Sequence, residues 1–223
     1  MPLLYKLSFC NIKKPGRLAL WEDVFILGLH FAETQERSMM IFVKICDMIP
    51  ILLSSEGETM LKVIIIGSPG AGKSTFARKL RDVTGLPLYY LDMLWHKPDR
   101  TTISRESFDL QLNEILKKDY WIIDGNYQRT LEPRLKACDT VFLLDFPLEV
   151  CLLGAQTRIG TKREDLPWIE TEVDEEFQQS IIDFPKTQLP GIYDLLRKYQ
   201  SSRKVIVLQS RAEADDYLTT FHR

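Results

Sequence analysis

The chain reads Gly67-Ser68-Pro69-Gly70-Ala71-Gly72-Lys73-Ser74-Thr75 directly after an apolar run at residues 61–66. This stretch matches the pattern G-x-x-x-x-G-K-[ST]. An amphipathic segment follows it and carries Phe76 and Leu80 on one face. A strand, a glycine-rich loop and a helix, in that order, form the context in which the pattern binds phosphate groups. We therefore predict a phosphate-binding loop at residues 67–75, with an ordinary glycine-rich turn as the alternative.

The predicted loop captures anions through its backbone. Gly67, Gly70 and Gly72 lack side chains, so the chain can curl around a polyphosphate and direct successive N–H groups at it. The helix that begins near Gly72 adds the positive end of its dipole. In this arrangement Lys73 would bridge the β- and γ-phosphates of ATP, and the Ser74 hydroxyl would bind Mg²⁺. We therefore expect ATP and Mg²⁺ as cofactors.

The composition limits the classes of protein that fit. The chain has 223 residues, of which 45% are hydrophobic and 27% charged, with a formal net charge of −2. Such a balance argues against a nucleic-acid binder that works through a basic surface. The cysteines show no C-x-x-C spacing, which favours free thiols in a reducing cytoplasm. No apolar run approaches the roughly eighteen residues of a membrane span, so we expect no membrane association.

Residues 1–59 contain no motif whose chemistry we can name. Their apolar patches are short and are interrupted by Pro15-Gly16, by Pro50 and by scattered charges. One interpretation is a poorly ordered N-terminal extension. The other rests on Glu56-Gly57-Glu58-Thr59-Met60, which can be encoded by a purine-rich ribosome-binding sequence a few bases ahead of an ATG codon. Residues 1–59 would then be an untranslated leader read as protein, and residues 60–223 the working domain.

From Met60 onward, β-type runs alternate with segments of helical periodicity. The predicted strands are residues 61–66, 88–91, 120–124, 140–145 and 204–208. Gly85 is a predicted helix stop, Ser104 a predicted N-cap, and Ser210 with Glu213 a predicted capping box. Short apolar strands separated by helices indicate a parallel sheet covered on both faces. We predict an α/β fold, a three-layer α/β/α sandwich with a five-stranded parallel sheet and a small lid insertion at about residues 158–171.

Three carboxylates fall at the predicted strand ends, where the ligand crevice of a parallel sheet lies. Asp124 is the candidate for binding Mg²⁺ opposite Ser74, and its alternative role is to cap the turn at Gly125-Asn126. Asp92 would orient the acceptor or take its proton, unless it is a loop carboxylate without a role. For Asp145 we favour the role of a helix cap.

A second group of candidates is basic. Arginine donors on a closing segment stabilise the charge that phosphoryl transfer spreads over the equatorial oxygens. Arg158 and Arg163 lie in the polar stretch that reads as the insertion, although acidic neighbours make a solvated loop the alternative. Arg129 is a candidate for binding the acceptor, and Arg134 is a weaker candidate for the same crevice.

Aromatic and histidine side chains near these positions carry less information. His96 lies close to Asp92 in the sequence and would line an acceptor pocket, although a lone surface histidine is commoner. Trp95 and Trp168 would stack on a base, with a role in the core or in the lid as the alternative for each.

Several stretches carry a family resemblance. They are the loop at residues 67–75, Tyr90-Leu91-Asp92, Trp121-Ile122-Ile123-Asp124-Gly125-Asn126-Tyr127, and the basic stretch at residues 158–163. On these grounds residues 60–223 resemble the adenylate-kinase-like P-loop NTPases and, more narrowly, the bacterial group called DNA topology modulation proteins. The resemblance implies a P-loop nucleoside-kinase-like domain, ATP as donor, Mg²⁺, and a lid that closes over the phosphates.

The chain also departs from the adenylate kinase pattern. Asp124-Gly125-Asn126-Tyr127 lacks the proline and arginine that usually follow Asp-Gly in that family. The segment between Asp92 and Trp121 is short for a standard nucleoside-monophosphate domain. Both departures argue against AMP as the acceptor.

The sequence as a whole predicts a cytoplasmic, ATP-dependent phosphotransferase of the nucleotide-kinase type, monomeric or homodimeric. Its acceptor would be a small molecule, a nucleoside or nucleotide in the first reading. Lys73 would hold the donor phosphates, and Arg158 with Arg163 would neutralise charge in the transition state. One alternative is a kinase for a non-nucleotide metabolite. The other is a nucleotide-binding regulator linked to DNA topology, which would need neither Asp92 nor the lid arginines.

Overall fold

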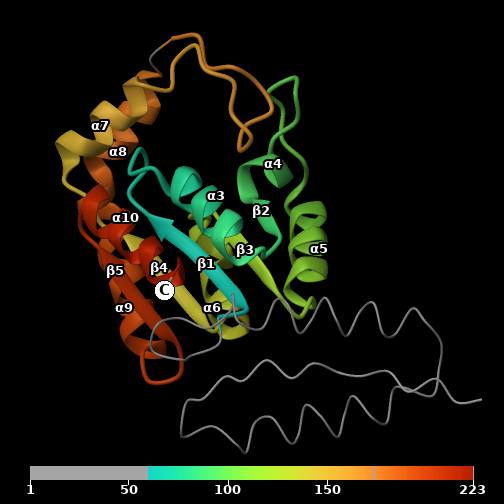
Figure 1. Cartoon of the computed structure of the whole chain (residues 1–223). Helices are drawn as coiled ribbons and strands as arrows, with labels where there is room; N and C mark the ends of the chain where they lie inside the picture. The colour runs from blue at the N-terminus through green and yellow to red at the C-terminus, as the bar shows by residue number, and fades with distance from the viewer. Residues whose placement is uncertain (1–59, 173, 223) are drawn as a thin grey trace, which may run out of the picture. The chain divides into compact units, whose positions relative to one another are not determined.

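The structure is a computed structural model that describes residues 60–172 and 174–222. Its sheet has five parallel strands in the order β2-β3-β1-β4-β5 (Figure 1). The strands are β1 Lys62–Gly67, β2 Leu88–Tyr90, β3 Trp121–Asp124, β4 Thr140–Leu144 and β5 Lys204–Leu208. The predicted five-stranded parallel sheet is therefore confirmed. The predicted extension, residues 1–59, lies outside the described residues.

Helices alternate with these strands and cover both faces of the sheet. They are α3 Lys73–Thr84, α4 Leu91–Trp95, α5 Arg105–Leu116, α6 Leu131–Ala137, α7 Leu148–Gln156, α8 Glu175–Thr187, α9 Leu189–Tyr199 and α10 Arg211–Thr219, with short 3-10 turns η1 Gln128–Thr130 and η2 Thr220–His222. None of the helices in the described part of the chain has the length and apolar character that a bilayer crossing requires.

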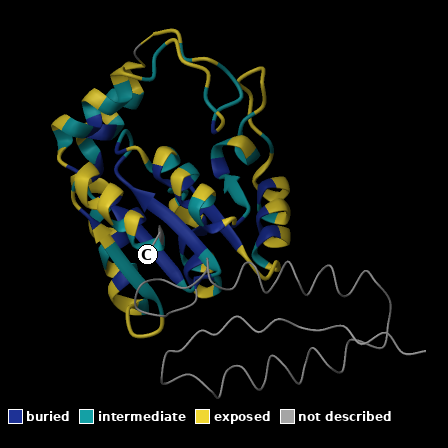
Figure 2. Cartoon of the chain, in the orientation of Figure 1, coloured by how far each residue is buried: buried dark blue, intermediate teal, exposed yellow. Residues whose placement is uncertain are grey.

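The core lies on the two faces of the sheet. Side chains of β1 alternate between the faces, because successive residues of a strand point to opposite sides: Val63 and Ile65 join one cluster, and Ile64 and Ile66 join the other. Helices α3, α7 and α10 contribute to the first cluster, α4, α5, α6 and α9 to the second, and α8 to both. Figure 2 shows the buried strands between partly exposed helices. This arrangement is the predicted three-layer α/β/α sandwich.

The predicted helix signals act as expected. Gly85 ends α3 with a positive φ of 71°, and its N–H bonds to a carbonyl in the last turn. Ser104 caps α5, since its side chain accepts a hydrogen bond from a backbone N–H in the first turn. Ser210 caps α10 by accepting from Glu213 N–H, and the Glu213 side chain accepts from Gln209 N–H. Local sequence therefore defines where these helices begin or end.

Helix α4 was not expected. The pattern predicted a strand through Leu91 and a loop from Met93, but residues 91–95 form a short helix. Leu91 is fully buried in the second cluster, so the chain leaves the sheet after Tyr90 to place that side chain under the helical layer. Asp92 consequently lies in the first turn of a helix and not at the end of a strand.

The prediction for α8 was shifted. A helix at residues 172–184 was predicted, whereas α8 spans Glu175–Thr187. Asp174 sets the start, because its side chain accepts a hydrogen bond from Phe177 N–H. The helix also continues past Pro185, although proline lacks the N–H of a regular helical hydrogen bond.

The connection between α7 and α8 carries the predicted lid insertion. Figure 1 shows it as an arch that leaves the α7–α8 side and reaches across towards α4. Strand β1, which leads into the glycine-rich loop, lies at the centre of the sheet between β3 and β4. A crevice at the carboxyl ends of parallel strands is where ligands bind in such folds. The arch lies at the same end of the sheet as the loop, because Asp165 of the arch accepts a hydrogen bond from Ser74.

Candidate active site

The glycine-rich loop follows β1 directly and is held by close backbone contacts. Gly67 and Gly70 have positive φ values of 135° and 80°. A Cβ atom at Gly67 would lie 2.1 Å from the Leu144 carbonyl oxygen, and one at Gly70 would lie 2.1 Å from the Cys151 carbonyl oxygen. Only glycine fits where backbones approach this closely. Strand β4 and helix α7 thus hold the loop in place.

A side chain that the sequence did not single out also holds the loop. The Asn126 amide accepts a hydrogen bond from Gly67 N–H at 3.0 Å and donates one to the Gly67 carbonyl at 2.9 Å. This pair of bonds joins the segment after β3 to the start of the glycine-rich loop. In the sequence, Asn126 read only as part of a turn.

Arg134 supports this arrangement from the core and does not reach the crevice. It is fully buried, and its guanidinium donates to the carbonyl of Gly125 at 2.7 Å, to that of Tyr127 at 3.2 Å and to that of Asn126. Burial lowers the pKa of Arg134 to about 10. The weak prediction of a crevice role for Arg134 is therefore replaced by a structural one.

Lys73 begins α3 and lies against its own loop. Its Nζ atom donates to the carbonyls of Gly67 at 3.1 Å and Ser68 at 3.0 Å. Burial lowers the pKa of Lys73, and the charges of Asp124 and Asp92 counteract this shift. Charges from β3 and α4 therefore act on this ammonium group of α3.

Asp124 is a buried carboxylate with an unsatisfied oxygen. It is 5% exposed, and its Oδ1 atom has no hydrogen-bond partner. Burial raises the pKa of Asp124 to about 6, and Lys73 and Ser74 oppose this rise. Because buried polar atoms in folded proteins nearly always have a partner, an unpaired oxygen beside the loop indicates a position for a ligand.

The donor set around Asp124 fits Mg²⁺, which prefers oxygen ligands. Asp124 contributes the unpaired carboxylate oxygen, and the Ser74 hydroxyl is close enough to lower its pKa. No group of three or more His, Cys, Asp or Glu side chains that could hold a metal occurs in the described part of the chain. Magnesium at these two residues would therefore take its other ligands from phosphate and water, as it usually does.

Asp92 is oriented by an aromatic neighbour. Its Oδ1 atom accepts a hydrogen bond from the Tyr127 hydroxyl at 2.8 Å. The Tyr127 ring stacks on Phe108 at 5.1 Å and meets Trp95 edge-on at 6.3 Å. Trp95 therefore contributes to this aromatic cluster, which corresponds to the core role that we considered for it.

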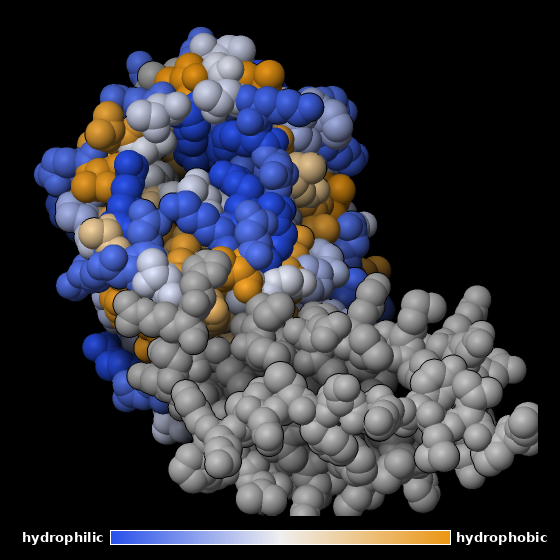
Figure 3. All heavy atoms as spheres, in the orientation of Figure 1, coloured by the Kyte–Doolittle hydropathy of each residue, from blue (hydrophilic) through white to orange (hydrophobic). Residues whose placement is uncertain are grey.

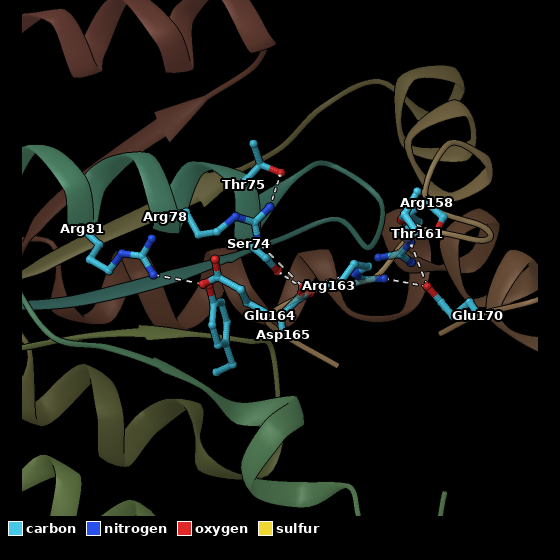
Figure 4. A network of polar contacts seen from close by, with 11 residues as sticks. Ser74, Thr75, Arg78, Arg81, Arg158, Thr161, Arg163, Glu164, Asp165 and Glu170 are labelled. Atoms are coloured by element: carbon cyan, nitrogen blue, oxygen red, sulfur yellow. Dashed lines mark hydrogen bonds and ion pairs between the residues drawn. The ribbon is translucent and has the colours of Figure 1, made fainter. Parts of the chain in front are cut away.

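The lid, residues 158–171, is internally paired. Arg163 donates to both carboxylate oxygens of Asp165 and, at 2.6 Å, to Glu170 (Figure 4). Arg158 lies 3.7 Å from the same Glu170 carboxylate and 4.6 Å from the centre of the Phe177 ring. Burial and the nearby Arg163 lower the pKa of Arg158. The two predicted arginines therefore lie together, joined by Glu170.

The lid contacts α3 at Ser74, a candidate from the sequence, and at two arginines to which the sequence assigned no role. The Ser74 hydroxyl donates to Asp165 at 2.8 Å, and Arg78 lies 3.8 Å from the same carboxylate. One residue away, Glu164 pairs with Arg81 at 3.0 Å. These contacts could not be predicted from the sequence, because acidic residues beside arginines are usual in solvated loops.

Two other candidate residues make contacts with side chains of the protein. Arg129 forms a two-pronged ion pair with Asp109 of α5, with both distances 2.7 Å, and is largely exposed. It therefore pairs with a protein carboxylate and is not drawn into the group around Lys73. His96 packs edge-on against Trp168 of the lid at 5.1 Å, a contact that corresponds to a lid role for Trp168.

The space between the lid and the loop is polar. Figure 3 shows this face hollowed beneath the arch, with hydrophilic residues gathered in the hollow. Lys73, Asp124 and Asp92 from three elements, with Arg163 from the lid, are charged groups of the candidate site, and the Ser74 hydroxyl is a neutral one.

No family model matches the chain. Its relatives among well-described proteins include the adenylate kinases of Thermotoga petrophila and Thermotoga maritima, each 29% identical over 90 residues. The matched stretch covers 39% of this chain and 39% of each of those enzymes, so the chain spans about two fifths of the length of the relatives it matches.

Solved structures similar to this one include two shikimate kinases. That of Acinetobacter baumannii in complex with shikimate has a TM-score of 0.48 and 22% identity, over 73% of this chain and 91% of its own. That of Bacteroides thetaiotaomicron has a TM-score of 0.45 and 16% identity, over 72% and 96% of the two chains.

Proposed function

We propose that this protein is an ATP-dependent kinase that transfers the γ-phosphate to a hydroxyl of a small acceptor. The observations that carry the proposal are the glycine-rich loop with Lys73 bound to its carbonyls, and the buried Asp124 with its unpaired Oδ1 atom, whose charge acts on Lys73. Phosphoryl transfer requires a cation at the phosphates, a metal site, a group that orients the acceptor and donors for transition-state charge.

The donor half of the site rests on α3 and β3. Backbone N–H groups of residues 67–75 would bind the phosphates, and Lys73 would move from the loop carbonyls onto them. Ser74 and Asp124 would hold Mg²⁺, which neutralises phosphate charge when it is bound. The unpaired Oδ1 atom of Asp124 supports this assignment.

The acceptor half centres on Asp92. Tyr127 donates to one of its oxygens, which leaves the other free to accept a hydrogen bond from an acceptor hydroxyl and take its proton. Of the arginines considered for this side, Arg129 pairs with Asp109 and Arg134 with backbone carbonyls. A phosphate-bearing acceptor would require free cations there, so we favour an acceptor recognised by its hydroxyl, as in a nucleoside.

A non-nucleotide metabolite remains the second candidate acceptor. Trp95 contacts Phe108 and Tyr127, and Trp168 contacts His96, so both indoles already have aromatic partners within the protein. Stacking on an acceptor base would require one of them to leave its partner. A small hydroxyl compound without a base, such as a sugar acid or an amino alcohol, would leave both indoles in place.

Release of ADP from Mg·ATP, measured with a panel of nucleosides, nucleoside monophosphates and hydroxylated metabolites, tests the proposal. We expect one acceptor class to raise the rate, Lys73→Ala to abolish it, and Asp92→Asn to reduce it by about 10²–10⁴-fold through loss of proton transfer. Lys79→Ala is the matched control, since Lys79 is exposed on the same helix and pairs with Asp215.

A different result of the same assay would contradict the proposal. Tight nucleotide binding with a slow ADP release that no acceptor changes would contradict a kinase. It would favour the nucleotide-binding regulator, and a salt-sensitive affinity for DNA would then support the link to DNA topology.

A further inference from the structure

The most deeply buried carboxylate of the lid is Asp165. It is 2% exposed and accepts a hydrogen bond from the Ser74 hydroxyl at 2.8 Å. Both of its oxygens also accept from Arg163, and Arg78 lies 3.8 Å away. Burial alone would raise the pKa of Asp165, but the hydrogen bonds and charge of Arg163 hold that pKa below its usual value. The side chain is therefore a buried anion whose partners are a hydroxyl and two arginines.

These partners are the donors that the proposed reaction requires for its phosphates and metal. Arginine forks bind carboxylate and phosphate with the same two-pronged geometry. In the proposed function, Ser74 binds Mg²⁺ and Arg163 binds transferring phosphoryl oxygens. One carboxylate of the protein occupies both of them.

We propose that Asp165 is an internal competitor of the donor nucleotide: its carboxylate holds the lid down on Ser74, and Mg·ATP binds by displacing it. The inference rests on the proposed function only in taking residues 67–75 as the nucleotide site. It adds a regulatory residue that controls access to that site.

The hydrogen bonds of Arg163 support displacement over shared binding. Its Nε and Nη2 atoms donate to Asp165, and its Nη1 atom donates to Glu170. Both edges of the guanidinium are therefore engaged with carboxylates. Release of Asp165 frees the Nε–Nη2 edge for a phosphate, whereas Glu170 still holds the opposite edge and keeps the arginine in position.

Electrostatics supports the same conclusion. Asp165 is close enough to Asp124 to raise its pKa, as is Asp92. A triphosphate would add further negative charge to this group, and like charges repel strongly where water is excluded. Expulsion of Asp165 removes one of these charges and leaves Asp124 and Ser74 to the metal.

The remaining lid contacts are suited to release. Glu164 pairs with Arg81 at 3.0 Å, and these two side chains are 55% and 35% exposed. Ion pairs at such exposure hold two parts of a protein together only weakly. Trp168, four positions beyond Glu164, packs against His96 and lies 5.9 Å from the Arg100 guanidinium. Asp165 thus makes the buried contact between the lid and α3, and the neighbouring ion pair of Glu164 with Arg81 is exposed and weak.

Calorimetric titration of the full chain with Mg·ATP and Mg·ADP measures the competition directly. Asp165→Asn keeps the shape but removes the charge, so we expect it to bind both nucleotides roughly tenfold or more tightly than the wild type. Glu172→Gln makes the same charge change at an exposed position of the α7–α8 connection, and we expect an unchanged Kd. Lys73→Ala should lose binding altogether.

A second measurement follows the lid in the wild-type chain. Because Trp168 contacts His96, its fluorescence, isolated by subtraction of the Trp168→Phe variant, reports whether the lid is docked. We expect saturating Mg·ATP to shift this emission, and the nucleotide-free Asp165→Asn protein to show the shifted emission already. A circular dichroism melt of each variant confirms that it is folded.

The outcomes separate the two proposals. Failure of the wild type to bind nucleotide would overturn the proposed function. Normal wild-type binding that depends on Lys73, together with equal or weaker binding by Asp165→Asn, would overturn the competitor alone. Titration of Asp165→Asn with ATP in EDTA completes the set: a loss of affinity that appears with Mg·ATP and not with metal-free ATP would show that Asp165 is a metal ligand and would overturn the competitor. An unchanged Trp168 emission on addition of Mg·ATP to the wild type would show that the lid stays docked, and would also overturn it.

Discussion

At the scale of single residues, Asp124 shows a conflict between stability and function. A carboxylate that is 5% exposed with an unpaired oxygen costs free energy whenever it is ionised. Its raised pKa, about 6, expresses that cost. Metal ligands and catalytic groups commonly show such shifts, because the environment that disfavours the charge also strengthens its interaction with a cation.

The Asp124→Asn variant should therefore be more stable than the wild type in the absence of ligands. The pKa of Asp124 in the folded state, about 6, lies above the ordinary value of 3.8. The contribution of this group to the free energy of unfolding is therefore largest below pH 4 and is lost as the pH rises to about 6. At pH 8 the variant should gain up to roughly 3 kcal/mol, since one pKa unit corresponds to about 1.36 kcal/mol.

Urea denaturation of both proteins between pH 4 and pH 8 checks this prediction. The difference between the two unfolding free energies should widen with pH and level off above about pH 6.5. Asp216→Asn, at an exposed position of α10, serves as control. A pH-independent difference would mean that Asp124 is not the group that titrates.

Arg134 shows the opposite case, a buried charge used for structure. Its guanidinium donates to three consecutive backbone carbonyls, at Gly125, Asn126 and Tyr127. Substitution by methionine fills the space but leaves these acceptors unpaired, which should cost about 3–5 kcal/mol and lower the melting temperature by roughly 10 °C or more. Lysine should not rescue the loss, because it lacks the fork.

The control for Arg134 is Arg129→Ala. Both arginines were sequence candidates for the crevice, but Arg129 makes only an exposed ion pair with Asp109. Such pairs contribute about 0–1 kcal/mol, so the melting temperature should change little. Equal effects of the two substitutions, measured by calorimetry, would contradict the structural role of Arg134.

At the scale of elements, the glycine-rich loop depends on helix α7 behind it. Gly70 packs against the Cys151 carbonyl. A Cβ atom added at Gly154 would in turn lie only 2.1 Å from the Gly70 carbonyl oxygen. The sequence predicted a helix here from Leu148, Leu152 and Ala155 but gave no reason to connect it with the loop. Helix α7 thus supports the loop that we propose as the phosphate site.

Gly154→Ala should therefore reverse the usual effect of glycine replacement in a helix. Alanine normally stabilises a helix interior by about 0.5–1 kcal/mol. At Gly154 the added methyl must displace the Gly70 carbonyl, so we expect a destabilisation of about 1–3 kcal/mol and weaker binding of Mg·ADP.

The matched control is Gly191→Ala in α9, where an added Cβ meets no atom within 4 Å. This variant should gain the ordinary helical stabilisation and bind nucleotide unchanged. Chemical denaturation gives the stabilities and calorimetry the affinities. A stabilised Gly154→Ala protein with normal nucleotide affinity would show that α7 does not support the loop.

Local signals in the sequence explain why most elements were predicted. The apolar runs of the strands and the caps at Ser104 and Ser210 act within a few residues of themselves. Helix α4 was missed because its cause is not local. Leu91 is buried where its side chain contacts the segment after β3, and a Cβ at Gly125 would lie 2.9 Å from it. Such contacts override short-range preference.

At the scale of the whole molecule, local sequence signals predict one part of the candidate site, and contacts between distant segments form the part that was missed. The loop at residues 67–75 is a contiguous motif, and Asp92 and Asp124 follow predicted strands. The contact between Ser74 and Asp165 spans 91 positions of the chain. Periodicity gives no information about such a pairing, and charges on a loop are usually solvated. From the sequence, Asp165 is therefore only one of the acidic neighbours that make a solvated loop the alternative for Arg158 and Arg163.

The stability of the molecule should depend most on the layer between the sheet and α3. Phe142 of β4 is fully buried and contacts Phe76 of α3 at 4.9 Å and Tyr217 of α10 at 5.1 Å. One ring thus joins three elements in edge-to-face contacts, which add to the free energy of burying its apolar surface. No other residue on this face of the described sheet makes ring contacts with both helices.

Phe142→Ala should therefore cost about 3–5 kcal/mol, because it removes a large buried side chain and leaves a cavity that the sheet cannot collapse to fill. For a domain of this size the melting temperature should fall by roughly 10 °C, as measured by differential scanning calorimetry. Leu153→Ala on α7 is the control, since Leu153 is 55% exposed and should change stability by less than about 0.5 kcal/mol. A loss below about 1 kcal/mol at Phe142 would mean that contacts other than this cluster hold α3 and α10 to the sheet.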